Sequence, residues 1–195
     1  LALNDNAFEL CREFIQPQGD RFFHQVNRYS DYLVQVAKRP EYKSGDTLKL
    51  ILPFLKAQGL TNARIEAYSR QNVTLLTGAE GAFKFLHSRG FPIFEISTSY
   101  QPFAEAVGLR LGFKKERIFS TALDLDRFSL PAAEAEEIKR LQGEIVAAPA
   151  IELPPDAAAA DLPAPVAEAI AVMDRIFGER LPAMEIGALL QEVNP

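Results

Sequence analysis

The stretch TGAEGAFKFLHSRGFPIFEISTSYQPFAEAVGLRLGFKKERIFSTAL, residues 77–123, decides the fold class of this chain. A helical pattern over 77–90 leads into a run of strand-forming residues over 91–96, and a second helical pattern over 101–111 leads into a second strand pattern over 117–123. Helices that alternate with strands through short links are typical of right-handed crossovers in a parallel sheet. The sequence therefore predicts an α/β fold with parallel strands in this segment.

Three hydroxyl side chains, Ser97, Thr98 and Ser99, directly follow the first predicted strand. The carboxyl end of a parallel strand is where α/β folds place ligands. Hydroxyl groups and the backbone N–H groups beside them can bind phosphate oxygens there, so the three residues are candidate phosphate ligands. A turn that caps the helix over 101–111 would account for the same residues without any ligand.

Helical patterns flank this α/β segment on both sides. Apolar residues recur at helical spacing over 4–15, 20–39, 45–59 and 62–69 before it, and over 131–145, 166–177 and 182–190 after it. A Pro- and Ala-rich stretch over 147–165 has the composition of a linker or mobile loop. The expected organisation is a helical unit over 1–70, an α/β unit over 71–127 and a second helical unit over 128–195.

Composition restricts the classes of function. Residues of the hydrophobic class make up 48% of the 195, which is enough for a sizeable core and excludes disorder throughout. The net charge of −5 and the absence of a basic block argue against a nucleic-acid partner. No apolar run approaches the roughly 18 residues that span a membrane, so no membrane contact is expected. The single cysteine, Cys11, excludes an internal disulfide and fits a reducing, cytoplasmic location.

Two further groups of residues could carry chemistry. Asp124 and Asp126 form an Asp-x-Asp pair after the second predicted strand, and carboxylates so spaced could hold Mg²⁺ or supply a nucleophile. A plain turn produces the same pattern. His24 and His87 lie in different predicted helices without a metal-ligand partner at a characteristic spacing, so we interpret both as structural.

Three polar residues are weaker candidates for contact with a substrate. Arg21 and Arg28 lie in the helix predicted over 20–39, and a guanidinium group matches the geometry of a phosphate. A solvated helix face would account for both. Asn6 belongs to a polar stretch at the start of the chain, which helix capping also explains.

Several widespread site motifs are absent from the sequence. It contains no GxGxxG, no GxxxxGK[ST] and no GxSxG pattern. Dinucleotide binding, P-loop nucleotide hydrolysis and α/β-hydrolase chemistry therefore lose their main support.

The segment LLTGAEGAFKFLHSRGFPIFEIST, residues 75–98, resembles the haloacid dehalogenase (HAD) superfamily. In that superfamily a Gly-containing turn and a helix lead to a strand that ends in Ser or Thr, the second signature motif. The opening LNDNAFELCREFI, residues 3–15, is similar to a branch described as phosphoglycolate-phosphatase-like or as subunit R of an energy-converting hydrogenase. The similarity extends through residues 45–62, 96–108 and 186–195.

This resemblance implies a Rossmann-like HAD core, partial here, with a helical cap over 1–70 and a second helical insertion over 128–195. In the superfamily an Asp attacks phosphorus and a second Asp protonates the leaving group. The second-motif hydroxyl binds phosphoryl oxygens, while a Lys and Mg²⁺ neutralise charge. Relatives carry the nucleophile before the stretch matching Leu1 and the Lys and Mg²⁺ ligands after the stretch matching Pro195. We therefore expect the chain, which begins without Met, to be part of a longer, catalytically complete protein.

The expected function is hydrolysis of a small phosphorylated metabolite by the complete protein, through an aspartyl phosphate and with Mg²⁺ as cofactor. The 195 residues alone are expected to be inactive. One alternative is a non-catalytic HAD-like interaction subunit of a larger complex, and a homo-oligomer is also open. A second alternative is a self-contained helical binding domain, which predicts that no parallel strands form over 92–97 and 117–123.

Overall fold

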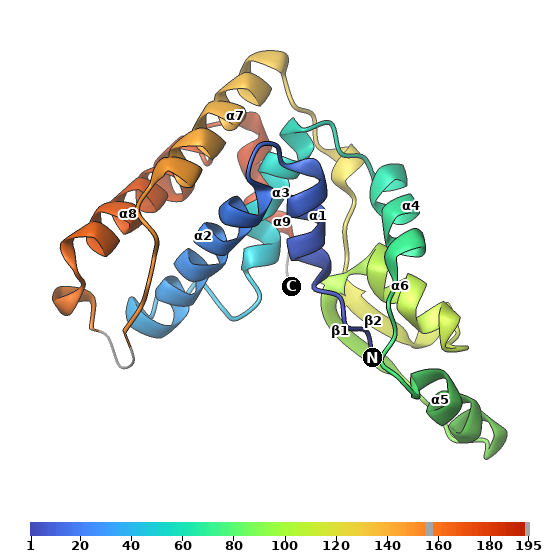
Figure 1. The fold of residues 1–195 in the computed structure, drawn as a ribbon. Helices are drawn as coiled ribbons and strands as arrows, with labels where there is room; N and C mark the ends of the chain where they lie inside the picture. The colour runs from blue at the N-terminus through green and yellow to red at the C-terminus, as the bar shows by residue number, and fades with distance from the viewer. Residues whose placement is uncertain (155–157, 194–195) are drawn as a thin grey trace.

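The protein forms an arch of two arms, one wholly helical and one α/β (Figure 1), in a computed structural model that describes residues 1–154 and 158–193. The helical arm contains α1 (Asn6–Phe14), α2 (Gly19–Asp31), α3 (Thr47–Ala57), α7 (Ala132–Ala147), α8 (Ala164–Arg175) and the short α9 (Leu189–Glu192). The α/β arm contains α5 (Ala79–Ser88), β1 (Glu95–Tyr100), α6 (Gln101–Arg110) and β2 (Ile118–Thr121). Helix α4 (Asn62–Asn72) packs against α6.

The helices form where the apolar spacing predicts them, and local signals set several of their ends. The Asp5 carboxylate accepts a hydrogen bond of 3.0 Å from the backbone N–H of Phe8 and caps α1. The hydroxyl of Thr61 accepts one of 3.3 Å from the N–H of Arg64 and caps α4. Helix α2 continues into a π-helical turn over Tyr32–Val36, which ends before the positive φ of Lys38.

The two strands are parallel and joined by α6, which confirms the predicted α/β crossover. Glu95 pairs with Ile118, Ile96 with Phe119 and, after a register shift, Tyr100 with Thr121. The alternative of a wholly helical domain is wrong, because it predicted no parallel strands in this segment. The structure describes a mostly helical α/β fold with this small two-stranded sheet.

The first strand lies four residues later than the sequence predicts. It runs over Glu95–Tyr100 instead of 91–96, so Ser97, Thr98 and Ser99 are inside the strand rather than after it. Pro92 has no N–H to donate to a ladder, which disfavours pairing of the earlier segment. Tyr100 is fully buried, and its hydroxyl donates a short hydrogen bond to the carbonyl oxygen of Leu48 in α3. This anchor in the helical arm holds the polar residues before Tyr100 extended.

One hydrophobic core unites the helices that precede and follow the α/β segment. Its fully buried members include Leu10, Phe22, Phe54, Ile138 and Met173, which come from α1, α2, α3, α7 and α8. The predicted boundaries at 70 and 128 stay predictions. The structure adds that helices from the two predicted helical units pack together. A second, smaller cluster fills the α/β arm between α6 and its neighbours, formed by Val73, Phe103, Val107, Leu111 and Phe113.

Part of the predicted linker over 147–165 is fixed to the helical arm. The side-chain amide of Gln25 donates to the carbonyl oxygens of Ala148 (3.2 Å) and Pro149 (2.8 Å). Its oxygen accepts from the N–H of Ile151 (3.1 Å), and Ile151 is buried. The start of this stretch is therefore packed, whereas residues 155–157 lie outside the described part of the chain.

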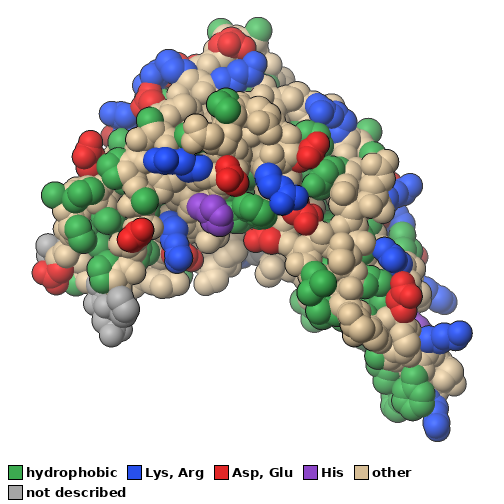
Figure 2. Space-filling view, viewed as in Figure 1, with side chains coloured by type: hydrophobic (Ala, Val, Ile, Leu, Met, Phe, Trp, Pro, Cys, Tyr) green, Lys and Arg blue, Asp and Glu red, His purple; other side chains and the backbone are tan. Residues whose placement is uncertain are grey.

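The α/β arm exposes large apolar side chains. Ile96 is 87% exposed, Phe94 57% and Phe119 54%, and the rings of Phe94 and Phe119 lie 6.4 Å apart. Phe85 and Phe91 are also exposed, and hydrophobic side chains gather at the free tip of this arm (Figure 2). We call these five residues the exposed apolar patch. Within it, Ile96 pairs with Phe119 and the ring of Phe94 lies against that of Phe119, and adjoining exposed apolar side chains are typical of contact surfaces.

No described helix is both long enough and apolar enough to cross a membrane.

The close approach of α6 to the sheet depends on Gly108. A Cβ at this position would lie 2.5 Å from Oε2 of Glu95 and 2.6 Å from Cδ1 of Ile118. We predict that Gly108→Ala lowers the free energy of unfolding by about 1 kcal/mol, because overpacking of about 1–3 kcal/mol exceeds the gain in helix propensity.

Gly143 in α7 is the matched control, since a Cβ there meets no atom within 4 Å. Gly143→Ala should raise the free energy of unfolding by up to about 1 kcal/mol. Urea denaturation of both variants measures the difference. Equal stabilisation by the two substitutions would contradict close packing of α6 on the sheet.

Glu95 places a carboxyl group in the interior between β1 and α6. Its side chain is buried, and its Oε2 has no hydrogen-bond partner among the described residues. Burial disfavours the charged form and raises the pKa of Glu95 above its ordinary value. The folded state therefore holds this proton more tightly than the unfolded chain does.

The consequence is a loss of stability as pH rises. Below the ordinary glutamate pKa of about 4.3, both states are protonated and Glu95 makes the free energy of unfolding no more pH-dependent. Above it the unfolded chain deprotonates first, so the free energy of unfolding falls until the pH passes the raised pKa. Relative to wild type, Glu95→Gln should gain stability progressively across this window and stay constant above it. A pH-independent difference between the two proteins in urea denaturation would contradict the burial of this carboxyl.

Candidate functional site

A cavity of about 440 Å³ lies where four segments distant in sequence meet, beside the end of β1. Its wall is formed by residues 4–7 at the start of α1, by Phe23, Asn27, Ser30 and Asp31 of α2, by Ser44, Gly45, Thr47 and Leu48 before and within α3, and by Thr98 and Ser99 of β1. Most of these side chains are polar. The cavity therefore joins the helical arm to the end of the strand that the sequence marks as a candidate phosphate site.

Asn4 fixes the first segment of this wall. Its Nδ2 donates to Oε1 of Glu9 (2.8 Å) and to the carbonyl oxygen of Asn72 (2.9 Å), and its Oδ1 accepts from the N–H of Thr74 (2.7 Å). The N–H of Leu3 also donates to the carbonyl oxygen of Thr74 (2.8 Å). These bonds hold the chain in place just before α1 begins.

Asn6 is the unusual residue of the cavity. It is only 4% exposed, yet neither its Nδ2 nor its Oδ1 has a hydrogen-bond partner among the described residues. Leaving a buried polar group unpaired costs about 1–3 kcal/mol. Both amide atoms are buried from solvent, and Asn6, one of the substrate contacts that the sequence proposed, is among the residues that line the cavity.

The three hydroxyl residues of β1 have different surroundings. Thr98 and Ser99 line the cavity, whereas Ser97 does not. The Oγ of Ser97 accepts a hydrogen bond of 3.1 Å from the N–H of Ser99, within the strand. The backbone carbonyl oxygen of Thr98 accepts a hydrogen bond of 2.7 Å from the hydroxyl of Thr121 on β2. The side chain of Thr98 is exposed and lines the cavity. The structure thus brings Asn6, Thr98 and Ser99 together.

Helix α2 supplies a further part of the wall. The hydroxyl of Thr47 donates to Oδ1 of Asn27 (3.0 Å), so the Asn27 amide keeps its donor side for other partners. The carboxylate of Asp31 lies 3.6 Å from the guanidinium of Arg28. Burial raises the pKa of Asp31, and the charge of Arg28 partly opposes this shift. Arg28 itself is mostly exposed beside the cavity and is not part of its wall.

The loop before α3 is held by a buried carboxylate. Oδ2 of Asp46 accepts from the N–H of Lys43 (3.0 Å) and lies 2.7 Å from Nζ of Lys49. Asp46 is fully buried, so this arrangement fixes the loop that carries Ser44, Gly45 and Thr47. The cavity wall is therefore rigidly placed on the side of α3.

Arg21, the other arginine proposed from the sequence, and Arg39 after the same helix have structural contacts away from the cavity. Arg21 donates to the carbonyl oxygen of Ala148 (3.2 Å) and helps to fix the segment after α7. Arg39 pairs with Asp174 of α8 at 2.9 Å, and the hydroxyl of Tyr29 donates to the same carboxylate (2.7 Å). The expectation that Arg21 faces a substrate phosphate thus finds no geometric support in this cavity.

The Asp-x-Asp pair, Asp124 and Asp126, lies in a turn that contacts Asn62, the first residue of α4. Asn62 donates from its side chain to Asp124 (2.7 Å) and from its backbone to Asp126 (3.2 Å), and its Oδ1 accepts from the N–H of Leu125 (2.7 Å). Within residues 1–154 and 158–193, no three or more His, Cys, Asp or Glu side chains are grouped so as to hold a metal ion. The plain-turn interpretation of this pair accounts for its contacts.

Both histidines contact aromatic rings. His24 lies 5.4 Å from the ring of Phe8, and His87 lies 6.0 Å from the ring of Phe113. Nε2 of His87 also lies 3.2 Å from the carbonyl oxygen of Leu111. These contacts agree with the structural interpretation of both residues.

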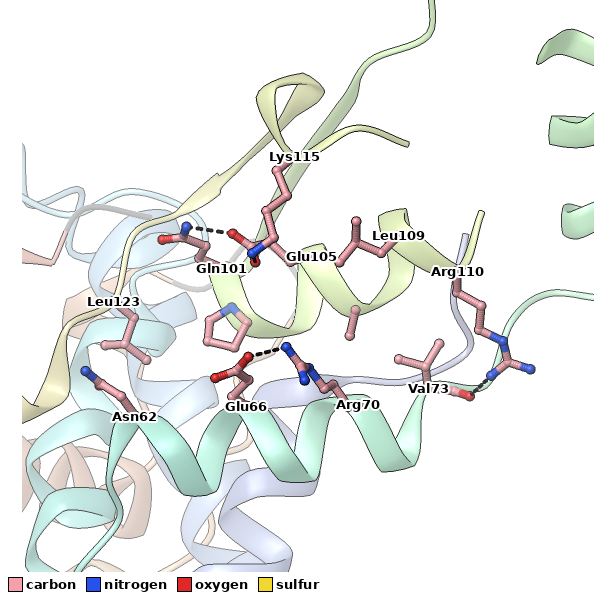
Figure 3. Close-up of a pocket in the computed structure, with 12 residues that line it drawn as sticks. Asn62, Glu66, Arg70, Val73, Gln101, Glu105, Leu109, Arg110, Lys115 and Leu123 are labelled. Carbon is pink, nitrogen blue, oxygen red and sulfur yellow. Dashed lines mark hydrogen bonds and ion pairs between the residues drawn. The ribbon is translucent and has the colours of Figure 1, made fainter. Parts of the chain in front are cut away.

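A larger groove of about 550 Å³ runs along the packed helices α4 and α6 (Figure 3). Charged side chains face it from both helices, and the structure pairs them. Arg70 lies 2.5 Å from Glu66, and Lys115 lies 2.7 Å from Glu105. Arg110 donates to the carbonyl oxygen of Val73 (2.9 Å). Because these groups already satisfy one another, the groove is a weaker site candidate than the smaller cavity beside β1.

Comparison with known proteins gives one structural relative to report. No family profile matches the chain, and no curated protein matches its sequence. The chain is similar in structure to gene product AF1437 from Archaeoglobus fulgidus, with a TM-score of 0.78 and 26% sequence identity over 99% of this chain. The match covers 54% of that protein's chain, so this chain spans about half the length of its relative.

The unpaired amide of Asn6 generates a stability prediction. Asn6→Leu replaces it with an apolar group of similar size and should leave the free energy of unfolding unchanged or raise it by about 1 kcal/mol. Asn62→Leu is the control, because Asn62 bonds both Asp124 and Leu125. It should cost about 2 kcal/mol. Urea denaturation distinguishes the two, and a comparable loss for Asn6→Leu would show that its amide is already paired.

Proposed function

We propose that this chain is the substrate-binding part of a HAD-type phosphatase that hydrolyses a small phosphorylated metabolite. Residues outside these 195 would supply the nucleophilic Asp, the Lys and the Mg²⁺ ligands of the complete protein. The observation that carries the proposal is the meeting of Thr98, Ser99 and the unpaired Asn6 in one cavity at the carboxyl end of a parallel strand. Open α/β sheets bind ligands at this position.

The proposal extends the two-stranded sheet to a larger Rossmann-like core. Ile96 and Phe119, paired neighbours on β1 and β2, are both more than half exposed. Parallel sheets usually have both faces covered, so such exposure is unusual in a finished core. Further strands and helices of the same protein would cover this surface. The greater length of the Archaeoglobus relative is consistent with a larger whole.

Each part of the cavity would have a distinct task in that reaction. The hydroxyls of Thr98 and Ser99 would hold phosphoryl oxygens and orient the phosphorus toward an incoming carboxylate. The walls from α1, α2 and α3 would enclose the rest of the substrate and limit the access of water. Mg²⁺ neutralises phosphoryl charge in such reactions. Among residues 1–154 and 158–193 no three or more His, Cys, Asp or Glu side chains are grouped to hold it, so residues outside this chain would supply its ligands.

A non-catalytic interaction subunit is the second candidate function. The exposed apolar patch supports it, because surfaces of this composition commonly bind another protein. In that case the patch would contact a partner of the complex, and the cavity would have no catalytic role. Hydrolysis of p-nitrophenyl phosphate by the full-length protein separates the candidates. Mg²⁺-dependent turnover that EDTA abolishes supports the phosphatase, and a folded but inactive full-length protein supports the interaction subunit.

The phosphate site itself can be tested on the present chain by titration calorimetry with inorganic phosphate. Thr98→Val keeps the shape of the side chain and removes the hydroxyl that lines the cavity. It should weaken phosphate binding about tenfold, which corresponds to ~1.4 kcal/mol. Ser97→Ala is the control and should change the affinity less than about threefold, because the Ser97 hydroxyl bonds within the strand. Equal losses in both variants, or no loss in Thr98→Val, would contradict the assigned contact.

A further inference from the structure

We infer that Thr121, a buried residue of β2, is a positioning residue for the proposed phosphate site, because its hydroxyl holds the peptide unit that joins Thr98 to Ser99. The inference rests on the proposed function, in which these two residues hold phosphoryl oxygens. Thr121 is only 3% exposed and is not among the residues that line the cavity. It therefore acts through β1 and not by contact with a ligand.

The backbone ladder between the strands does not by itself hold this part of β1. The register of the sheet shifts between Ile96 and Tyr100, so that residues 97–99 lie opposite the single residue Ser120 of β2. A strand with extra residues leaves some of its backbone groups without ladder partners and bends locally. The segment that carries the candidate phosphate ligands therefore needs other contacts to keep one conformation.

The hydroxyl of Thr121 supplies such a contact. It donates a hydrogen bond of 2.7 Å to the carbonyl oxygen of Thr98, from one strand to the other. A peptide unit is planar, so a bond that holds its carbonyl oxygen also restrains its N–H and the Cα atoms on either side. In this unit the N–H belongs to Ser99, and the two Cα atoms carry the side chains of Thr98 and Ser99. One hydrogen bond from β2 therefore orients both candidate phosphate ligands.

The same peptide unit has a second, more exposed restraint. The N–H of Ser99 donates to Oγ of Ser97 at 3.1 Å, and Ser97 is half-buried. Water can replace a hydroxyl at a half-buried position, whereas the loss of a buried donor leaves its acceptor unpaired at a cost in free energy. The bond from the buried Thr121 is therefore the main restraint, which agrees with the small effect expected for Ser97→Ala.

Titration calorimetry of the present chain with inorganic phosphate tests this role. Thr121→Val keeps the shape of the side chain and removes the donor, so it should weaken phosphate binding about fivefold. Thr121→Ser keeps the donor and should bind phosphate within about twofold of the wild-type affinity. Circular dichroism and urea denaturation establish that each variant is folded under the conditions of the titration.

Thr61→Val is the matched control for a general loss of stability. The hydroxyl of Thr61 caps α4 by accepting the N–H of Arg64 at 3.3 Å, and Thr61 does not line the cavity. Its loss should lower the free energy of unfolding and leave the phosphate affinity within about twofold of wild type.

NMR of the ligand-free chain gives a readout that does not depend on phosphate. In Thr121→Val the amide signal of Ser99 should shift, and its proton should exchange with solvent faster than in wild type, because the peptide unit has lost its main restraint. Thr61→Val should leave the exchange of this proton unchanged.

The outcomes separate this inference from the proposed function. The same phosphate affinity in Thr121→Val and wild type would overturn the positioning role and keep the phosphate site. Equal losses in Thr121→Val and Thr121→Ser, or in Thr121→Val and Thr61→Val, would also overturn it, because the effect would then not depend on the hydroxyl at this position. If the folded wild-type chain binds no phosphate, the proposed function fails and the positioning role fails with it.

Discussion

The burial of Tyr100 is the constraint on which the arrangement of the site depends. Its side chain ends β1 inside the core of the helical arm and donates to the carbonyl oxygen of Leu48. Because the strand is fixed at that end, Thr98 and Ser99 are extended and lie beside the loop before α3 and the start of α1. The α/β arm and the helical arm thereby share one cavity, although each has its own hydrophobic cluster.

Local sequence signals predicted most of this fold, and long-range contacts account for the differences. The spacing of apolar residues predicts where the helices lie, and Pro and Gly predict where they end, because these signals act within a few residues. The start of β1 was misplaced because its position depends on Tyr100, whose partner Leu48 lies 52 residues earlier. Likewise, nothing local in residues 147–165 indicates that Gln25, more than 120 residues earlier, fixes the start of that stretch.

For the same reason the sequence points to only part of the cavity wall. Thr98 and Ser99 were identified by their place near a strand end, and Asn6 by its polar surroundings. Asn27 and Asp31 were missed, although their spacing of four residues places them on one face of α2 and could have marked that face. Arg21 is a candidate phosphate contact only because a guanidinium group matches the geometry of a phosphate. Its actual partner, the carbonyl oxygen of Ala148, lies more than 120 residues away and cannot be predicted without the fold. The missing partners of Asn6 can be recognised only from packed coordinates.

The central claim is that the cavity beside β1 binds a phosphorylated ligand through the strand and the start of α1. Backbone amide shifts of the isotopically labelled chain, followed by NMR during titration with glycerol 3-phosphate, test it most directly. The account predicts saturable shifts concentrated at residues 4–7, 27–31, 44–48 and 98–99. Shifts centred on the groove between α4 and α6, or no saturable shifts in a folded chain, would contradict it.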